Sequence, residues 1–315
     1  MRAVVVERYG PPSVARVMEV ADPVPRQGEV VVRVAAAAVN SGDARMRAAR
    51  FPRGFALPAR LGIGLRGPRR RVLGVALSGT VVSLGEGVTS LAVGDEVSGM
   101  TGARLGAHGE LVAVRADRLV PKPAGVPHDA AAAVLFGGCT ALHFLEDVAH
   151  LREGQSVLVV GASGAVGSSL VQVARLAGAR VTAVTSGRNA ELARRLGAAA
   201  VIDYTETPVE RIPERFDIVL DTVGALSTRA GRALLAEGGM LVLVLATLWQ
   251  TLAARGRVKA GVSGSRPEHM ARLLDLVASG ELDPVIQESL PMADIQRAYE
   301  IADSGRKVGN VVIRP

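Results

Sequence analysis

A glycine-rich turn near the middle of the chain carries the strongest chemical signal. The apolar run Ser156–Val160 leads directly into Gly161-Ala-Ser-Gly-Ala-Val-Gly167. Where a strand meets a helix through such a turn, unpaired backbone amides face a pyrophosphate. The pattern predicts a dinucleotide site, and a tight turn without a ligand is the alternative. The expected contacts come from Ala162, Ser163, Gly164, Ala165, Val166 and Gly167.

Each small residue of the turn has an expected task. Ala162 stands at the tight turn, where the dinucleotide fingerprint usually has its first glycine. Gly164 lets the backbone approach the pyrophosphate, and Gly167 lets the helix pack closely on the strand.

The end of the next apolar run, Arg180–Thr185, distinguishes the two nicotinamide cofactors. NAD-binding folds usually place a carboxylate here for the ribose hydroxyls. This chain instead continues with Ser186-Gly-Arg188 and has no acid there. Since hydroxyls and a guanidinium attract a 2′-phosphate, we predict NADPH as the cofactor, held by Ser186 and Arg188. A solvated arginine at the start of a helix is the alternative for Arg188.

The segment that must position these groups, residues 123–262, alternates between strands and helices. Continuous apolar strands between helices predict a parallel sheet that is covered on both faces, as in a doubly wound Rossmann domain. We expect helices at residues 130–150, with an interruption at Gly137-Gly138, and at 164–177 and 189–196. We expect strands at residues 156–160, 180–185, 200–203, 217–221 and 240–245.

The flanking segments have a different pattern. Residues 1–122 contain short strands broken by glycine and proline, which predicts a β-barrel-like domain. Residues 263–315 contain two expected helices, 267–278 and 293–302, and a last strand, 309–314, that is expected to pair with the first domain. The fold class is therefore α/β, with a β-barrel domain and a Rossmann domain.

Composition limits the cellular setting. Cys139 is the only cysteine, which excludes an internal disulfide and a four-cysteine zinc lobe and fits the cytoplasm. The N-terminus lacks an apolar stretch long enough for a signal peptide, and the longest apolar run, residues 240–245, is too short to cross a bilayer, so no membrane partner is expected.

The net charge of +7 raises the question of nucleic acid. The arginines are mostly scattered and aromatic residues make up only 3% of the chain, so we expect no nucleic-acid partner. Nucleic-acid binding on charge alone is kept as an alternative. The one dense cluster is read as a solvated loop, or as a device that steers an anionic cofactor or substrate. It comprises Arg66, Arg69, Arg70 and Arg71.

The order of these segments resembles the zinc-free quinone oxidoreductase branch of the medium-chain dehydrogenase/reductase superfamily. The resemblance implies a GroES-like β domain closed by the C-terminal segment, a Rossmann domain, and a homodimer formed through Rossmann-sheet edges. The matching pieces, in addition to the glycine-rich turn, are residues 36–43, 73–82, 85–88, 93–97, 106–110, 137–142, 217–224 and 305–313.

The same resemblance bears on metal chemistry. Zinc-dependent members have a cysteine at the position of Asn40 and Gly-His-Glu where this chain has Gly74-Val-Ala76. The resemblance therefore implies no metal. Without a Lewis acid to hold an alkoxide, hydride addition to a small, already polarised acceptor such as a quinone or an enone is the expected reaction.

The resemblance also implies site residues. Asn40 and Thr140 are expected near the nicotinamide, Ala246 in the loop that holds its carboxamide, and Tyr204 beside the 2′-phosphate. The alternatives are a strand-end role for Asn40, a helix cap for Thr140 and an ordinary surface position for Tyr204. Arg45 stands where many relatives have a tyrosine.

Asn40 or Arg45 is expected to stabilise negative charge on the substrate oxygen. His108 occupies a position that is commonly aromatic, and we expect it to be structural. The basic segment of residues 50–71 is read as a mobile loop or a rim that favours acidic or carrier-tethered substrates. Enoyl-thioester reduction and an NADPH-binding sensor with little turnover therefore remain alternatives.

Overall fold

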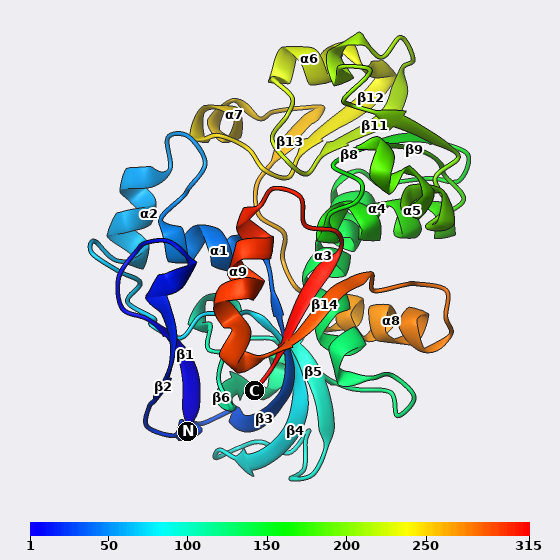
Figure 1. The fold of residues 1–315 in the computed structure, drawn as a ribbon. Coiled ribbons are helices and arrows are strands. Elements are labelled where there is room, and N and C mark those ends of the chain that lie inside the picture. Colours follow the sequence, from blue (N-terminus) through cyan, green and yellow to red (C-terminus); the bar gives the residue numbers. More distant parts are fainter. The chain divides into compact units, whose positions relative to one another are not determined.

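The chain folds into two compact units, each with its own sheet and apolar core (Figure 1). The computed structural model describes all 315 residues. The first unit comprises Met1–Phe51, Ala56–Phe136 and Ser265–Pro315. The second comprises Pro52–Phe55 and Gly137–Gly264.

The first unit is built on a seven-stranded sheet. Its strand order is β14-β15-β3-β4-β5-β7, with β6 also paired to β3. The last strand, β15, pairs antiparallel with β3, which confirms that the C-terminal segment joins the first domain. The strands are β3 (Glu29–Val39), β4 (Ala76–Leu84), β5 (Glu96–Met100), β6 (Leu111–Arg115), β7 (Leu119–Pro121), β14 (Ile286–Pro291) and β15 (Asn310–Arg314).

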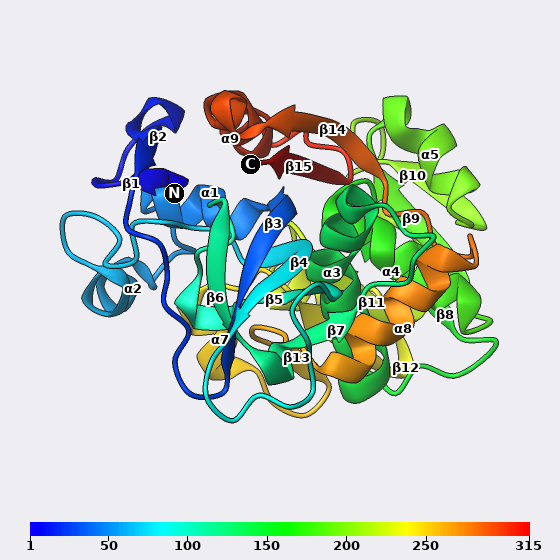
Figure 2. The ribbon, with the colours of Figure 1, turned by 90° about the horizontal axis from the view of Figure 1, so that it is seen from below.

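A two-stranded antiparallel sheet, four helices and the first part of α3 (His128–Leu142) complete the first unit. The strands β1 (Arg2–Val6) and β2 (Ala15–Glu19) pair with one another. The helix α9 (Ile295–Asp303) packs beside β15 and β14, as Figure 2 shows. The other helices are α1 (Ser41–Ala48), α2 (Ala56–Ile63) and α8 (Pro267–Ala278). The sequence patterns did not reveal α1 and α2, because both are only eight residues long and lack a helical apolar period.

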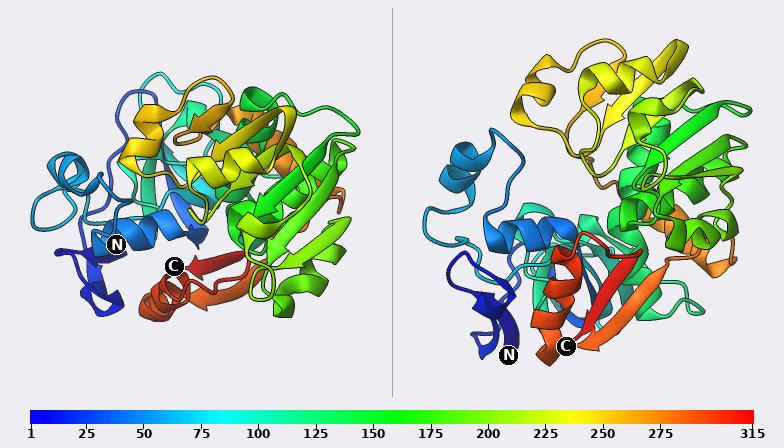
Figure 3. Two further views of the ribbon diagram at one scale, coloured as in Figure 1. Left: turned by 90° about the horizontal axis from the view of Figure 1, so that it is seen from above. Right: turned by 45° about the horizontal axis from the view of Figure 1, so that its top comes forward.

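The second unit is a parallel six-stranded sheet with the order β10-β9-β8-β11-β12-β13 (Figure 3). The chain moves outward from β8 to β10 and then returns to β11 on the other side of β8. This reversal between β8 and β11 is the point at which such sheets bind ligands. The strands are β8 (Ser156–Val160), β9 (Arg180–Thr185), β10 (Ala200–Asp203), β11 (Phe216–Asp221), β12 (Leu235–Leu243) and β13 (Val258–Ala260).

Short helices pack along this sheet. Helix α4 (Ala165–Leu176) packs on β8 and β9, α5 (Ala190–Arg195) packs on β9 and β10, and α6 (Thr228–Ala233) packs on β12. The remaining helix, α7 (Leu248–Ala253), contacts β13. One apolar core of this unit contains Leu158 and Val160 of β8, Val219 of β11, and Leu241 and Leu243 of β12.

The helix α3 (His128–Leu142) runs unbroken through Gly137-Gly138, so the expected interruption is wrong. A Cβ at Gly137 would overlap the carbonyl oxygen of Ala165, which means that this glycine serves close packing and does not end the helix. A π-helical turn, His143–Val148, continues α3. The stretch His128–Val148 is long and apolar enough to span a membrane by composition, but 72% of its apolar window is buried, as in a core helix.

Candidate dinucleotide and active site

The glycine-rich turn follows β8 at the ligand-binding edge of the parallel sheet. Gly161 has a φ of 83°, and a Cβ there would lie 2.6 Å from the Thr222 hydroxyl. Gly161, and not Ala162, therefore adopts the left-handed backbone conformation that the turn requires. Ala162 is fully buried, and its amide donates to the carbonyl of Val184 at 3.1 Å.

The next two glycines differ in what surrounds them. A Cβ at Gly167 would overlap the carbonyl oxygen of Gly161, so α4 packs here against the turn itself. A Cβ at Gly164 would meet nothing closer than the same carbonyl oxygen, at 3.6 Å. Gly164 therefore faces open space, which a phosphate group requires for close approach to the backbone.

The N-terminus of α4 offers unpaired donors. Gly164 is the N-cap residue, and no side chain caps the helix. The first helical bond runs from the amide of Ser168 to the carbonyl of Gly164 at 2.8 Å. The amides of Ala165, Val166 and Gly167 precede that bond and lack helical acceptors. Together with the helix dipole, they can bind an anion.

Asn189 connects the turn to the end of β9, which sequence reasoning missed. Its Nδ2 donates to the Ser163 hydroxyl at 3.1 Å and lies 3.3 Å from the Ser186 hydroxyl. Arg188 is exposed beside it, in the 3-10 turn Gly187–Asn189. Tyr204 is 53% exposed, and its amide donates to the Thr185 carbonyl at 3.2 Å. Two serine hydroxyls therefore lie just after two neighbouring strands, and Arg188 lies in the turn that follows the second strand.

A carboxylate lies close to this group, at Asp203 on the end of β10. Its oxygen accepts hydrogen bonds from the Thr205 amide at 2.8 Å and the Thr205 hydroxyl at 2.7 Å. These bonds, with a further one from the Gly187 amide, hold the pKa of Asp203 below its usual range. The carboxylate is therefore ionised at neutral pH, and its hydrogen bonds fix the loop after β9.

Thr140 lies inside α3, so the helix-cap alternative is wrong. Its hydroxyl is 3.0 Å from the Ser263 hydroxyl, a pairing that the sequence did not suggest. Ala246 follows β12 and is only 7% exposed, which leaves its backbone as the group available for contact.

Asn40 is the N-cap residue of α1 and is only 3% exposed. Its Oδ1 accepts from the amides of Gly42 at 2.7 Å and Asp43 at 3.1 Å. The Asp43 carboxylate accepts from the Asn40 amide at 3.0 Å, which completes a capping box. Because two backbone donors fix Oδ1, the orientation of the amide is set, and the buried Nδ2 remains as a donor without a partner.

A buried polar cluster supports the same helix. Burial raises the pKa of Asp43, and one of its carboxylate oxygens has no partner. The His108 Nε2 lies 3.1 Å from the Ala38 carbonyl and 3.9 Å from the Asp43 carboxylate. Because a carbonyl oxygen can only accept a hydrogen bond, the Nε2 of His108 must carry the proton. His108 is fully buried, which agrees with a structural role.

Helix α9 completes this cluster. The Tyr299 hydroxyl lies 3.4 Å from the His108 Nδ1, and the pKa of Tyr299 is raised well above its usual value by burial. The Arg47 guanidinium lies 5.0 Å from the centre of the Tyr299 ring and pairs with Asp303. Arg47 is fully buried, so this contact between α1 and α9 fixes the helix that carries Asn40.

Arg45 is not brought to the side chain of Asn40. The buried residues of α1 are Asp43, Ala44 and Arg47, whereas Arg45 is half-buried on another face. Partial burial and the charge of Arg50 lower the pKa of Arg45. No hydrogen bond joins Arg45 to Asn40.

The residues present do not fit a zinc ion. No group of three or more histidine, cysteine, aspartate or glutamate side chains is placed to hold a metal. Asn40 has its oxygen engaged by backbone amides, and Gly74-Val-Ala76 offers no side-chain ligand. The only cysteine, Cys139, is buried, and its burial raises the pKa of the thiol to about 12.

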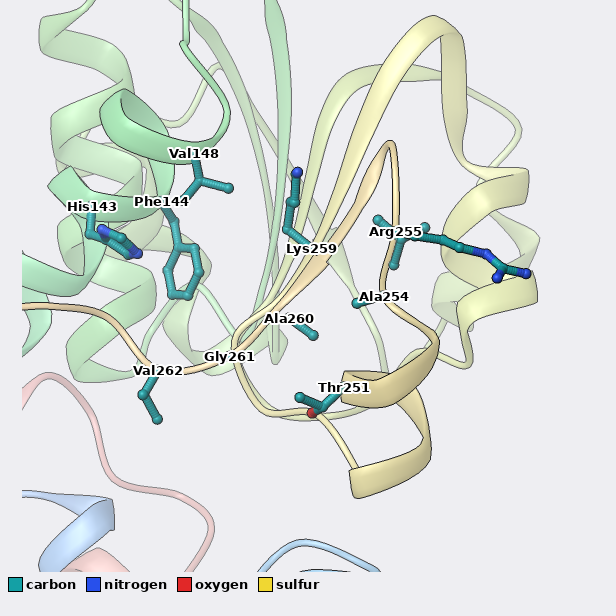
Figure 4. A pocket seen from close by; sticks show the side chains of 11 residues that line it. His143, Phe144, Val148, Thr251, Ala254, Arg255, Lys259, Ala260, Gly261 and Val262 are labelled. Atoms are coloured by element: carbon teal, nitrogen blue, oxygen red, sulfur yellow. The ribbon is translucent and has the colours of Figure 1, made fainter.

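A cavity of about 230 Å³ lies in the second unit beside the edge strand β13 (Figure 4). Phe144 and Val148 come from the π-helical turn, and Thr251 and Ala254 come from α7 and its end. None of the expected cofactor contacts lines this cavity, so it is separate from the glycine-rich turn.

Comparisons with known proteins agree with this architecture. Residues 26–124 match the alcohol dehydrogenase GroES-like domain, and residues 196–313 match the zinc-binding dehydrogenase family. The chain is 31% identical over 307 residues to the 2-methylene-furan-3-one reductase of Solanum lycopersicum, covering 94% of this chain and 74% of that protein.

Two further comparisons extend this agreement. The chain is 28% identical to the chloroplastic NADPH-dependent alkenal/one oxidoreductase of Arabidopsis thaliana, covering all of this chain and 80% of the other. The solved quinone oxidoreductase of Coxiella burnetii superposes with a TM-score of 0.89 at 26% identity, covering 100% of this chain and 99% of that one. The chain therefore belongs to the medium-chain dehydrogenase/reductase superfamily, in its quinone oxidoreductase-like branch.

Proposed function

We propose that the chain is an NADPH-dependent oxidoreductase that reduces a quinone, an enone or a similar activated double bond. The observation that carries the proposal is the uncapped N-terminus of α4, where three amides without helical acceptors lie next to the open face of Gly164. The names of the relatives, an enone reductase and an NADPH-dependent alkenal/one oxidoreductase, point to the same chemistry.

The cofactor contacts follow from the second unit. The amides of Ala165 to Gly167 bind the pyrophosphate, and the Ser163 hydroxyl, held by Asn189, lies at the same turn. Ser186 and Arg188 bind the 2′-phosphate, with Tyr204 at its border. Thr140 and the backbone around Ala246 hold the nicotinamide. When bound, NADPH supplies the hydride.

Asn40 is proposed to act on the substrate. Its Nδ2 is buried, has no partner and is fixed as a donor by the two bonds to Oδ1. Such a donor stabilises negative charge that develops on a substrate oxygen, and it does so without reorganisation because the capping box already holds it. Arg45 contributes positive charge from the neighbouring face of α1, and solvent delivers the final proton.

We further propose that the reaction is independent of zinc. This proposal is supported by the side chains at the positions where zinc-dependent relatives have metal ligands. Neither Asn40 nor Gly74-Val-Ala76 provides a thiolate, imidazole or carboxylate ligand. An acceptor that is already polarised needs no Lewis acid, which fits an enone or a quinone better than an alcohol.

A homodimer in the cytoplasm is proposed from the resemblance and from two features. Strand β13 is a three-residue edge strand with an unpaired side. Exposed apolar side chains lie on α7, which contacts β13, and just after the strand: Trp249, Leu252 and Val262. Exposed edges and apolar patches mark interfaces. The lone, free Cys139 fits a reducing compartment.

Turnover tests the proposal directly. Purified protein is mixed with NADPH and a panel of quinones, enones and enoyl thioesters, and the loss of NADPH absorbance is followed. Consumption with quinones or enones supports the proposed reaction, and consumption only with thioesters favours the enoyl reductase alternative. Tight NADPH binding without consumption across the panel identifies a sensor and refutes the enzyme assignment.

A further inference from the structure

One short stretch of the chain carries positive charge with no acidic residue to balance it. Residues 50–71, called here the arginine–leucine segment, contain seven arginines and no acidic residue. The formal net charge of the whole chain is +7. The rest of the chain is therefore neutral overall, and the excess positive charge belongs to this segment.

Most of these arginines have no carboxylate partner. Arg50 pairs with Asp303, and Arg71 lies 3.4 Å from Glu7. The other five side chains are exposed and form no ion pair: Arg53, Arg60, Arg66, Arg69 and Arg70. Their charge is therefore available to an external anion.

Apolar side chains protrude from the same segment. Helix α2 buries none of its residues. Leu57 and Leu61, one turn apart on one face of α2, are 68% and 56% exposed, and Leu65, just beyond the helix, is 64% exposed. Large apolar side chains gathered on a surface mark an interaction site.

Helix α2 and the turn that follows it are anchored to the first unit, whereas residues 52–55 of the segment belong to the second unit. The Tyr9 hydroxyl donates to the Gly64 carbonyl at 2.6 Å, and the Arg69 amide donates to the Ile63 carbonyl at 2.7 Å. The Arg60 guanidinium lies 5.6 Å from the centre of the Tyr9 ring. Figures 1 and 2 both place α2 at the outer margin of the first unit, away from its seven-stranded sheet. The segment that was predicted as a mobile loop or a rim thus contains the helix α2.

We propose that the arginine–leucine segment docks the protein onto an anionic lipid surface. Arginines beside exposed leucines on a short helix are the composition of an interfacial segment, in which the apolar side chains enter the acyl boundary and the guanidinium groups contact lipid phosphates. Arginine forms bidentate bonds with phosphate, which strengthens such contacts. Such a surface contact requires no membrane-spanning helix. It differs from the prediction, made from the sequence, that the chain has no membrane partner.

The shape of the segment favours lipid over an acidic protein. A protein partner that inserts its own anchoring side chains needs a well-packed pocket on this surface. Residues 50–71 line neither the cavity beside β13 nor the one beside β1, and the three leucines are exposed. Protruding leucines enter a soft acyl layer without a preformed groove.

The test is cosedimentation of the full chain with vesicles. One set contains phosphatidylcholine alone, and a second contains about one third phosphatidylglycerol, which gives a negative surface potential. We expect binding to the anionic vesicles only, and we expect it to weaken as salt is added. A parallel sample tests retention on polyglutamate, which represents an acidic protein.

Two variants and a matched control locate the contact. The first variant combines Leu57→Ser, Leu61→Ser and Leu65→Ser. The second combines Arg66→Gln, Arg69→Gln and Arg70→Gln. The control combines Arg211→Gln, Arg229→Gln and Arg232→Gln, three exposed arginines of the second unit, and lowers the net charge equally. Because one arginine at an anionic surface contributes roughly fivefold, the second variant is expected to lose about two orders of magnitude in binding.

The control is expected to bind as the unmodified chain does, and the leucine variant is expected to lose binding. Circular dichroism and NADPH titration of each variant show whether the fold is intact. Absence of binding to anionic vesicles overturns the proposal, as does an equal loss in the control, which would show a net-charge effect. Retention on polyglutamate without vesicle binding would assign the surface to an acidic protein. None of these results depends on turnover, so failure here leaves the proposed oxidoreductase untouched.

Discussion

Replacement of Asn40 by serine separates the two tasks of this side chain. The Asn40 Oδ1 caps α1 by accepting from Gly42 and Asp43, whereas its buried Nδ2 has no partner in the protein. Serine is as good an N-cap acceptor as asparagine, so Asn40→Ser keeps the cap but removes the amide donor. Asn40→Ala removes both and serves as the comparison.

The two variants are expected to differ in thermal stability but to lose turnover alike. Loss of an N-cap costs about 1 kcal/mol, which corresponds to a drop in Tm of about 2 °C for a unit of this size, whereas serine is expected to leave Tm nearly unchanged. Loss of a single preorganised donor to a developing negative charge costs about 100- to 1,000-fold in kcat. Asn40→Ser is therefore expected to retain stability and lose turnover, and Asn40→Ala is expected to lose both.

The assay is steady-state NADPH oxidation with a saturating enone, next to thermal unfolding of both variants. NADPH affinity is expected to stay constant, because the proposed cofactor contacts all lie in the second unit. If Asn40→Ser kept full kcat, the free Nδ2 would have no role in the chemistry. Asn40 would then be a cap only, and the reasoning from its unpartnered donor would be refuted.

Three further perturbations test other parts of the account. Gly167→Ala puts a Cβ into the Gly161 carbonyl, so the helix must move, and NADPH affinity measured by calorimetry is expected to fall at least tenfold. Ser186→Asp places a carboxylate at the proposed 2′-phosphate site, and the ratio of kcat/KM for NADPH over NADH is expected to fall; an unchanged ratio would exclude Ser186 from that site. Burial lowers the pKa of Lys307 from 10.5 to about 8, so between these values the unfolded chain binds more protons and stability is expected to rise with pH. Lys307→Met is expected to flatten this rise in denaturant titrations, and an identical pH dependence in both proteins would contradict it.

Strong local patterns in the sequence predicted much of the second unit. The runs Ser156–Val160, Arg180–Thr185 and Ala200–Asp203 are strands with the expected bounds. Ser156–Val160 is a continuous apolar run directly before a glycine, which favours a buried parallel strand. The break expected at Gly137 was wrong, because that glycine admits the Ala165 carbonyl against α3, and only the packed structure reveals such a contact.

Other features depend on contacts between distant residues. Asn189 joins Ser163 to Ser186, and no spacing rule links these three positions. Asp203 was also missed, because the search for an acidic residue covered only the end of β9. Asp203 lies at the end of β10, beside the loop that follows β9. Helix α2 was not expected, because its leucines face outward and leave no amphipathic signal toward a core.

The sequence also did not reveal the polar cluster around α1, because that cluster depends on contacts between distant residues. Arg47 and Tyr299 lie far apart in the sequence, and charge alone gave no reason to bury a guanidinium over an aromatic ring. The resemblance pointed to Asn40, but only the capping box shows which of its two polar atoms remains free.

Calorimetric titration of the folded chain with NADPH and NADH tests the central claim most directly. NADPH is expected to bind more tightly than NADH, because the α4 amides bind the pyrophosphate of both cofactors and Ser186 and Arg188 bind the additional phosphate. Absence of heat with both NADPH and NADP⁺ would contradict it, since the proposed reaction would then have no source of hydride.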